Sequence, residues 1–162
     1  MGKVLRSAAA GALGGAVATL AMSAVLLVGR RAGLFDDHPP ELVIKRATAP
    51  TGPLPTLYPD EQEVAWPFGH LQFGAAMGLV YGVIRPALPR RLRTALGGGL
   101  IGVGLWLLNY GALAPALGLL PPVPREDTGR QVTNALAHDV YGPAHSTVTE
   151  WADRRTDGRS DR

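Results

Sequence analysis

The chain lacks cysteine and is poor in charged and aromatic residues. Of its 162 residues, none is Cys, 18% are charged and 6% are aromatic. The absence of Cys excludes disulfides, thiolate metal sites and thiol catalysis. The low share of charge is unusual for a soluble protein of this size. The charge is also unevenly distributed, because long uncharged blocks alternate with polar loops.

Motifs for catalysis, metal binding and cofactor binding are missing as well. The chain has no HExxH, no CxxC and no closely spaced pair of carboxylates on one helix, and the glycine-rich run at Gly97 follows no strand. Ser146 beside His145 is a helix neighbour and not a catalytic triad. The 16 Lys and Arg residues lie at the ends of apolar segments without interleaved aromatics. We therefore expect no enzyme activity, no metal, no cofactor and no nucleic-acid partner.

Glycine and apolar residues are abundant, and the stretch 67–88 (PFGHLQFGAAMGLVYGVIRPAL) organises them most clearly. It carries no charge until Arg85, and Gly74, Gly78 and Gly82 follow His70 at steps of four. Steps of four place side chains on one face of a helix. In water the glycines would weaken such a helix, but in lipid a small-residue ridge lets two helices approach closely. The stretch predicts a transmembrane helix with a glycine contact face.

Three further segments have the length of a membrane span. The chain is thus predicted to be all-α, a single membrane domain over 1–162 that forms a four-transmembrane-helix bundle. Its spans are 7–29, 67–88, 94–117 and 131–151, joined by an external loop 30–65, a cytoplasmic turn 89–93 and an external loop 118–130, with a cytoplasmic tail 152–162. Two alternatives stay open: the first span can be a cleavable signal peptide, and the fourth a surface amphipathic helix.

The first external loop contains one short predicted helix, 36–47, which Pro39 or Pro40 can open. We expect this helix to lie at the membrane interface. Orientation follows from Lys and Arg, of which ten fall on the side of the termini and six on the other side. The excess predicts a multi-pass protein of the bacterial inner membrane with both termini in the cytoplasm.

Polar residues inside the predicted spans form the candidate site. In the third span, Gly98, Gly102, Trp106 and Asn109 lie near one stripe. In the fourth span, polar residues are spaced by four, three and four and share a face; they are Asn134, His138, Tyr141 and His145. We expect an intramembrane polar cluster in the outer half that joins His70, Asn109, Asn134 and His138, with Asp139 beside it and His145 on the inner side.

Three roles are open for this cluster. The groups can be interhelical hydrogen bonds that hold the bundle together. They can handle protons, since imidazole titrates near neutrality and Asp139 would favour its charged form. They can bind a metal only if His70 or Asp139 joins one of the other histidines, because His138 and His145 are two helical turns apart.

Short motifs along the chain resemble one known family. They are HPPE in the first loop, GLVYG at Gly78 to Gly82, PALP, APALGLLPPVP, HDVYG and EWADRR. Together they resemble the YagU-type small bacterial inner-membrane proteins. The resemblance implies a four-span bundle in the inner membrane, a role in survival of acid stress and no catalytic residues. It carries over His70, Trp106, Pro115, His138 and Gly142, whereas Asn109 and Tyr110 stand where the family pattern has a histidine.

The predicted function is a non-enzymatic role in envelope or acid-stress physiology. The alternative is a small proton or ion transporter that uses intramembrane His and Asp, and a membrane enzyme is a third class. The expected partner is the lipid bilayer. A second copy of the chain and another membrane protein are both compatible with the glycine ridges, because such ridges serve contacts within or between chains.

Overall fold

The computed structural model describes residues 2–95 and 99–157, and these residues form helices and no strand. The prediction of an all-α protein is confirmed. In chain order the elements are α1 (Lys3–Arg31), α2 (Pro39–Ala47), α3 (Pro59–Ile84), η1 (Arg85–Ala87), α4 (Arg90–Ala95), α5 (Ile101–Leu105), η3 (Trp106–Leu113), α6 (Ala114–Ala116), η4 (Val123–Arg125) and α7 (Thr128–Asp157).

Proline and carboxylate residues set the starts of the two helices after α1. Pro39 and Pro59 occupy the first positions of α2 and α3, where the missing N–H costs nothing. Glu41 accepts a hydrogen bond from the His38 backbone N–H at 3.4 Å, and Glu61 accepts one from the Tyr58 N–H at 2.7 Å. Each carboxylate thus satisfies a backbone donor just before its helix begins.

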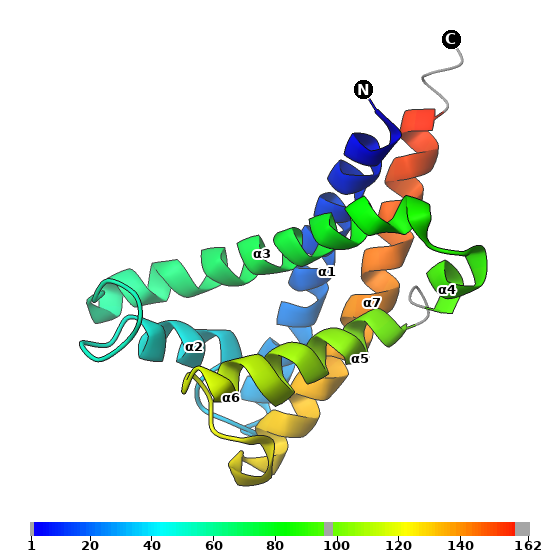
Figure 1. The fold of residues 1–162 in the computed structure, drawn as a ribbon. Helices are drawn as coiled ribbons and strands as arrows, with labels where there is room; N and C mark the ends of the chain where they lie inside the picture. The colour runs from blue at the N-terminus through cyan, green and yellow to red at the C-terminus, as the bar shows by residue number, and fades with distance from the viewer. Residues whose placement is uncertain (1, 96–98, 158–162) are drawn as a thin grey trace.

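Helix α1 is the centre of the molecule. It packs extensively against both α3 and α7, which approach it from different sides (Figure 1). Helix α7 runs antiparallel along α1, so the two ends of the chain lie at the same end of the molecule, whereas α3 crosses α1 obliquely (Figure 1). Helix α2 packs against α3, and α5 packs against α7.

The segment of the predicted third span is not one regular helix. Helix α4 is followed, after residues 96–98, by α5, and η3 then continues as a π-helix. π-Helical turns are rare and are often found at functional sites. The helix ends at Ala116, immediately after Pro115, and Gly118 follows with φ +69°. Proline followed by a left-handed glycine stops a helix by fixing φ and reversing the chain.

Burial is distributed in the opposite way to that of most water-soluble proteins. Large apolar side chains are exposed along the helices, including Leu20, Phe68 and Leu107 at 62%, 62% and 55% exposure. Polar side chains such as Thr149 and His145 are completely buried. Within the described part of the chain, α1 alone is long and apolar enough to cross a membrane, and the apolar run Ile101–Ala116 is shorter.

Candidate functional site

The glycine ridge of α3 lies directly against α1. A Cβ atom on Gly78 would overlap the Gly11 carbonyl oxygen, and one on Gly82 would overlap the Ser7 carbonyl oxygen. At Gly74 the added atom would overlap the Thr19 hydroxyl. The two backbones therefore approach so closely that a methyl group cannot fit between them, as small-residue ridges permit.

Helix α7 is also held by glycine contacts, through two other helices. A Cβ on Gly14 of α1 would overlap the Thr149 hydroxyl, and one on Gly102 of α5 would overlap the His138 carbonyl oxygen. Gly142 lies 2.9 Å, measured from its built Cβ position, from the Gly99 Cα. Gly98, the other predicted packing glycine, lies outside the described residues.

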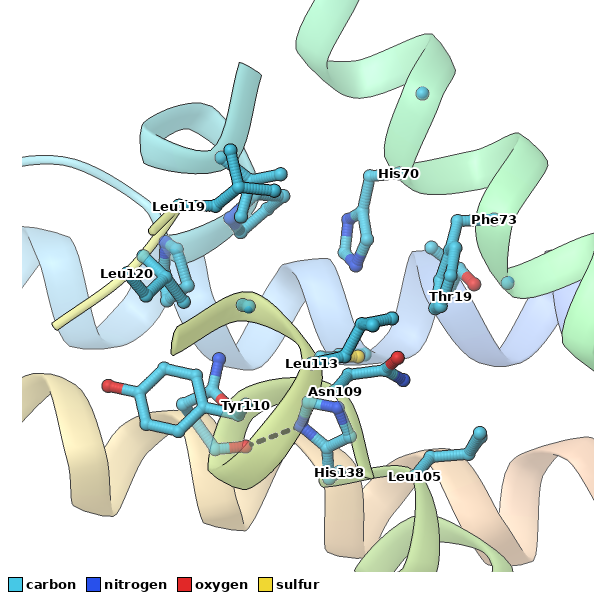
Figure 2. Close-up of a pocket in the computed structure, with 18 of the residues that line it drawn as sticks. Thr19, His70, Phe73, Leu105, Asn109, Tyr110, Leu113, Leu119, Leu120 and His138 are labelled. Atoms are coloured by element: carbon cyan, nitrogen blue, oxygen red, sulfur yellow. Dashed lines mark hydrogen bonds between the residues drawn. The ribbon is translucent and has the colours of Figure 1, made fainter. Parts of the chain in front are cut away.

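A cavity of about 360 Å³ lies between α1, α2, α3, η3 and α7 (Figure 2). Four residues of the predicted polar cluster line it together, namely His70, Asn109, Asn134 and His138. The rest of the lining is mostly apolar. The apolar side chains are those of Met22, Pro39, Pro40, Val43, Ile44, Phe73, Met77, Leu105, Leu113, Ala114, Leu117, Leu119 and Leu120. Of the described residues that line the cavity, none is Lys, Arg, Asp or Glu.

The two cavity histidines are each oriented by one hydrogen bond. His138 Nδ1 lies 2.9 Å from the Asn134 backbone oxygen. A carbonyl can only accept, so Nδ1 carries the hydrogen and Nε2 of the neutral ring is an acceptor. His70 Nδ1 lies 3.3 Å from the Ser23 hydroxyl, and its ring reaches from α3 toward Asn109 and His138 (Figure 2).

Asn134, which lines the cavity, has a side-chain hydrogen-bond acceptor without a partner. The Asn134 side chain is 2% exposed, and its Oδ1 is buried without a hydrogen-bond partner. Tyr141, on the same face of α7, instead donates its hydroxyl hydrogen to the Gly74 backbone oxygen at 3.0 Å. The cavity wall therefore contains both a fixed link between α3 and α7 and a polar end that can accept hydrogen bonds.

Asp139 and His145 do not line this cavity. Asp139 is exposed and lies near Gly99, where its Oδ1 is 3.5 Å from the built Cβ position. His145 is fully buried between Tyr141 and Tyr81, with ring centroids 5.8 and 5.1 Å away. Neither ring nitrogen of His145 has a hydrogen-bond partner of ordinary geometry. Its position is that of an aromatic packing residue.

A further predicted position, Trp106, packs beside the cavity without lining it, whereas its neighbour Tyr110 does line it. Trp106 stacks on Tyr110 at 5.9 Å between ring centroids, and its Nε1 is buried without a partner. Within the described residues, no three His, Asp or Glu side chains are grouped closely enough to hold a metal ion.

Sequence reasoning missed the contribution of α2 and the residues around it. The sequence predicts this helix at the membrane interface, and nothing in its periodicity indicates that Val43 and Ile44 line a cavity. His38, just before α2, stacks on Trp66 at 5.4 Å and is 5% exposed. Burial, followed by the nearby charge of Arg30, lowers the pKa of His38 below its ordinary value.

The chain matches one protein family over residues 5–160, which is nearly its whole length. It belongs to DUF6789, a family of unknown function. No curated protein and no solved structure matches it. Membership in DUF6789 therefore leaves the function of the cavity to be inferred from its geometry.

Proposed function

We propose that this protein is a non-enzymatic, multi-pass protein of the bacterial inner membrane that binds a neutral amphiphile in the cavity between its helices. The observation that carries the proposal is the combination of exposed apolar helix faces with a mostly apolar cavity between the helices that has one polar end. Exposed apolar surface of this extent would favour aggregation in water, whereas lipid accommodates it. The buried Thr, Asn and His side chains agree with helices that use polar groups as contacts inside a bundle.

Four spans are favoured by the way the helices pack. Helix α7 lies along α1, which supports a spanning segment over a surface helix. The packing of α1 between α3 and α7 supports an uncleaved first helix over a signal peptide. Arg85 and Arg93, from the basic segment after α3, line one cavity together with Lys3 near the start of α1 and Arg154 near the end of α7. This grouping supports a cytoplasmic location for the segment and both termini.

The ligand class follows from the lining. Apolar side chains dominate the cavity wall, so the ligand carries an alkyl or isoprenoid portion. His138 Nε2 and Asn134 Oδ1 are acceptors, so the head group of the ligand carries a hydrogen-bond donor such as a hydroxyl. Charged head groups are disfavoured because the described lining contains no Lys, Arg, Asp or Glu to offer a countercharge.

A photoreactive alcohol tests this proposal. The full chain is placed in lipid nanodiscs with a long-chain alcohol that carries a mid-chain diazirine, and the crosslinked peptides are identified by mass spectrometry. We expect labels on Ile44, Phe73 and Leu113, with competition by 1-decanol exceeding that by decane.

A cavity-filling variant and a matched control make the experiment specific. Gly69 lines the cavity, and an added Cβ would meet only the end of the Ile44 side chain, at 3.4 Å. Gly69→Leu is expected to abolish labelling of the cavity. Gly104→Leu, at an exposed glycine with open space around it, is expected to leave labelling unchanged. Equal labelling in both variants, or labels confined to lipid-facing residues such as Leu107, would overturn the proposal.

The physiological setting that we propose is the cell envelope under acid stress, which rests on the resemblance to YagU-type proteins. Its test is survival of a deletion strain at low pH, with and without the wild-type gene. A strain that survives as well as its parent would refute this setting and leave the binding proposal to the crosslinking result.

A second candidate is a proton or ion transporter, favoured because His70 and His138 line the same cavity. Asp139 lies outside the cavity lining, so such a transporter would depend on the histidines. Reconstituted liposomes with a pH gradient test this candidate. A proton flux that is present in the wild type and lost in His138→Ala supports transport. A wild-type flux no greater than that of empty vesicles refutes the transporter candidate.

A further inference from the structure

A second cavity, of about 350 Å³, lies at the end of the molecule that carries both termini. Its wall comes from the start of α1, η1 after α3, α4 and the end of α7. The basic lining residues are Lys3, Arg6, Arg85, Arg93 and Arg154, and the acidic ones are Glu150 and Asp153. Five cationic groups thus face two carboxylates, so the cavity carries an excess of positive charge.

The carboxylates have partners within this set. Arg85 forms an ion pair with Asp153, and both side chains are mostly buried. Arg154 forms a looser pair with Glu150 at 3.7 Å, and both of these side chains are exposed. The Arg85–Asp153 pair joins the end of α3 to α7 and so fixes one wall of the cavity. Lys3 and Arg93 supply charge beyond these two pairs.

A buried hydroxyl also lines the cavity. Ser7 is 5% exposed, and its Oγ is buried without a hydrogen-bond partner. A hydroxyl is a donor to anions as well as an acceptor. A buried polar atom without a hydrogen-bond partner destabilises the fold, so a ligand that hydrogen-bonds to Ser7 Oγ would relieve this cost.

We infer that this cavity binds a phosphate group. Arg and Lys side chains pair with phosphate oxygens through charge-assisted hydrogen bonds, and a serine hydroxyl supplies an additional donor. The phosphate can belong to the head group of an anionic phospholipid or to free inorganic phosphate, since both offer the same anionic oxygens. The inference stands on this cavity alone and does not depend on the proposed amphiphile site.

Binding of two phosphate sources to the full chain in an uncharged detergent tests the inference. Calorimetric titrations use dihexanoyl phosphatidylglycerol, inorganic phosphate and, as a zwitterionic comparison, dihexanoyl phosphatidylcholine. We expect phosphatidylglycerol or inorganic phosphate to bind roughly tenfold more tightly than phosphatidylcholine, as one charged hydrogen bond allows. Binding of phosphatidylglycerol alone identifies a lipid head group, and displacement of it by inorganic phosphate identifies a general phosphate site.

Three variants separate a built site from general surface charge. Arg93→Gln removes a lining cation, and Ser7→Ala removes the buried hydroxyl with little change in volume. Each is expected to weaken binding roughly tenfold. Arg91→Gln, at an exposed arginine of the same helix α4 outside the cavity lining, is expected to change binding less than roughly twofold. Equal weakening by Arg91→Gln would overturn the inference, and so would binding of phosphatidylglycerol and inorganic phosphate that is no tighter than that of phosphatidylcholine.

Discussion

Gly11 of α1 and Gly78 of α3 are in backbone contact, since a Cβ on either residue would overlap the carbonyl oxygen of the other. Relief of such an overlap requires the two helices to move apart, because the obstructing atom is backbone and cannot rotate away. Neighbouring contacts on both sides of this pair would separate with it. The pair is therefore a point where the α1–α3 contact does not tolerate added side-chain bulk.

Substitution of Gly78 by Ala is expected to destabilise the protein by about 1–3 kcal/mol, as overpacking of a close contact does. Gly104→Ala is the control, because nothing lies within 4 Å of its added Cβ. Thermal unfolding in a mild detergent measures both variants. A Gly78→Ala protein as stable as Gly104→Ala would show that α1 and α3 are not in contact.

Loss of the Tyr141 hydroxyl is expected to cost about 0.5–1.5 kcal/mol, the usual net value of one internal hydrogen bond. The bond to the Gly74 oxygen joins α7 to α3 at the cavity wall. Tyr141→Phe keeps the ring and removes only this bond. Tyr58→Phe is the comparison, since Tyr58 is 73% exposed. Chemical denaturation of the two variants should differ, and identical unfolding midpoints would contradict the assigned bond.

The two buried histidines of α7 are expected to respond differently to replacement by Phe. His145→Phe removes two ring nitrogens that lack partners and retains contact with Tyr81, so stability should be unchanged or higher. His138→Phe breaks the bond to the Asn134 oxygen and should cost about 1 kcal/mol. Parallel thermal unfolding measures this contrast, and a large loss in His145→Phe would point to a polar role for His145.

The stability of the fold is expected to fall in acid because of His38. Burial and the charge of Arg30 lower its pKa in the folded state, and these effects outweigh Glu41 and Asp37, which raise it. The unfolded chain has the ordinary value of about 6.5. Neutral His38 therefore contributes its full stability above that pH, and the contribution is lost as the pH falls below it.

Denaturation across pH 5–8 in the wild type and in His38→Gln measures this effect. The difference in unfolding free energy between the two proteins should be constant at the upper end of the range and should shrink toward pH 5. A difference that does not change with pH would show that His38 does not contribute to the acid response.

Single cysteines test the predicted orientation, and the chain has no native Cys to interfere. Asp36→Cys should react with an impermeant maleimide in intact cells, whereas Arg91→Cys and Asp157→Cys should react only after permeabilisation. Labelling of Arg91→Cys in intact cells would reverse the proposed topology. A protein that stays in solution without detergent would refute the membrane location altogether.

The helical class and the groups of residues that share a helix face could be read from the chain alone. Steps of four place Gly74, Gly78 and Gly82 together, and the spacing from Asn134 to His145 places the polar residues of α7 on one side, where the structure buries them. Sequence periodicity predicts which residues share a helix face because the helical repeat depends only on backbone geometry.

The pairing of those faces was decided by tertiary structure. The ridge of α3 contacts α1, His138 and Asn109 share a cavity with α2, and Asp139 lies outside it although it adjoins His138 in the chain. These outcomes depend on how each helix is rotated and where it crosses its neighbours, which are set by side-chain packing across the whole bundle. Local sequence determines what a helix offers on each face, and only the assembled helices determine what that face meets.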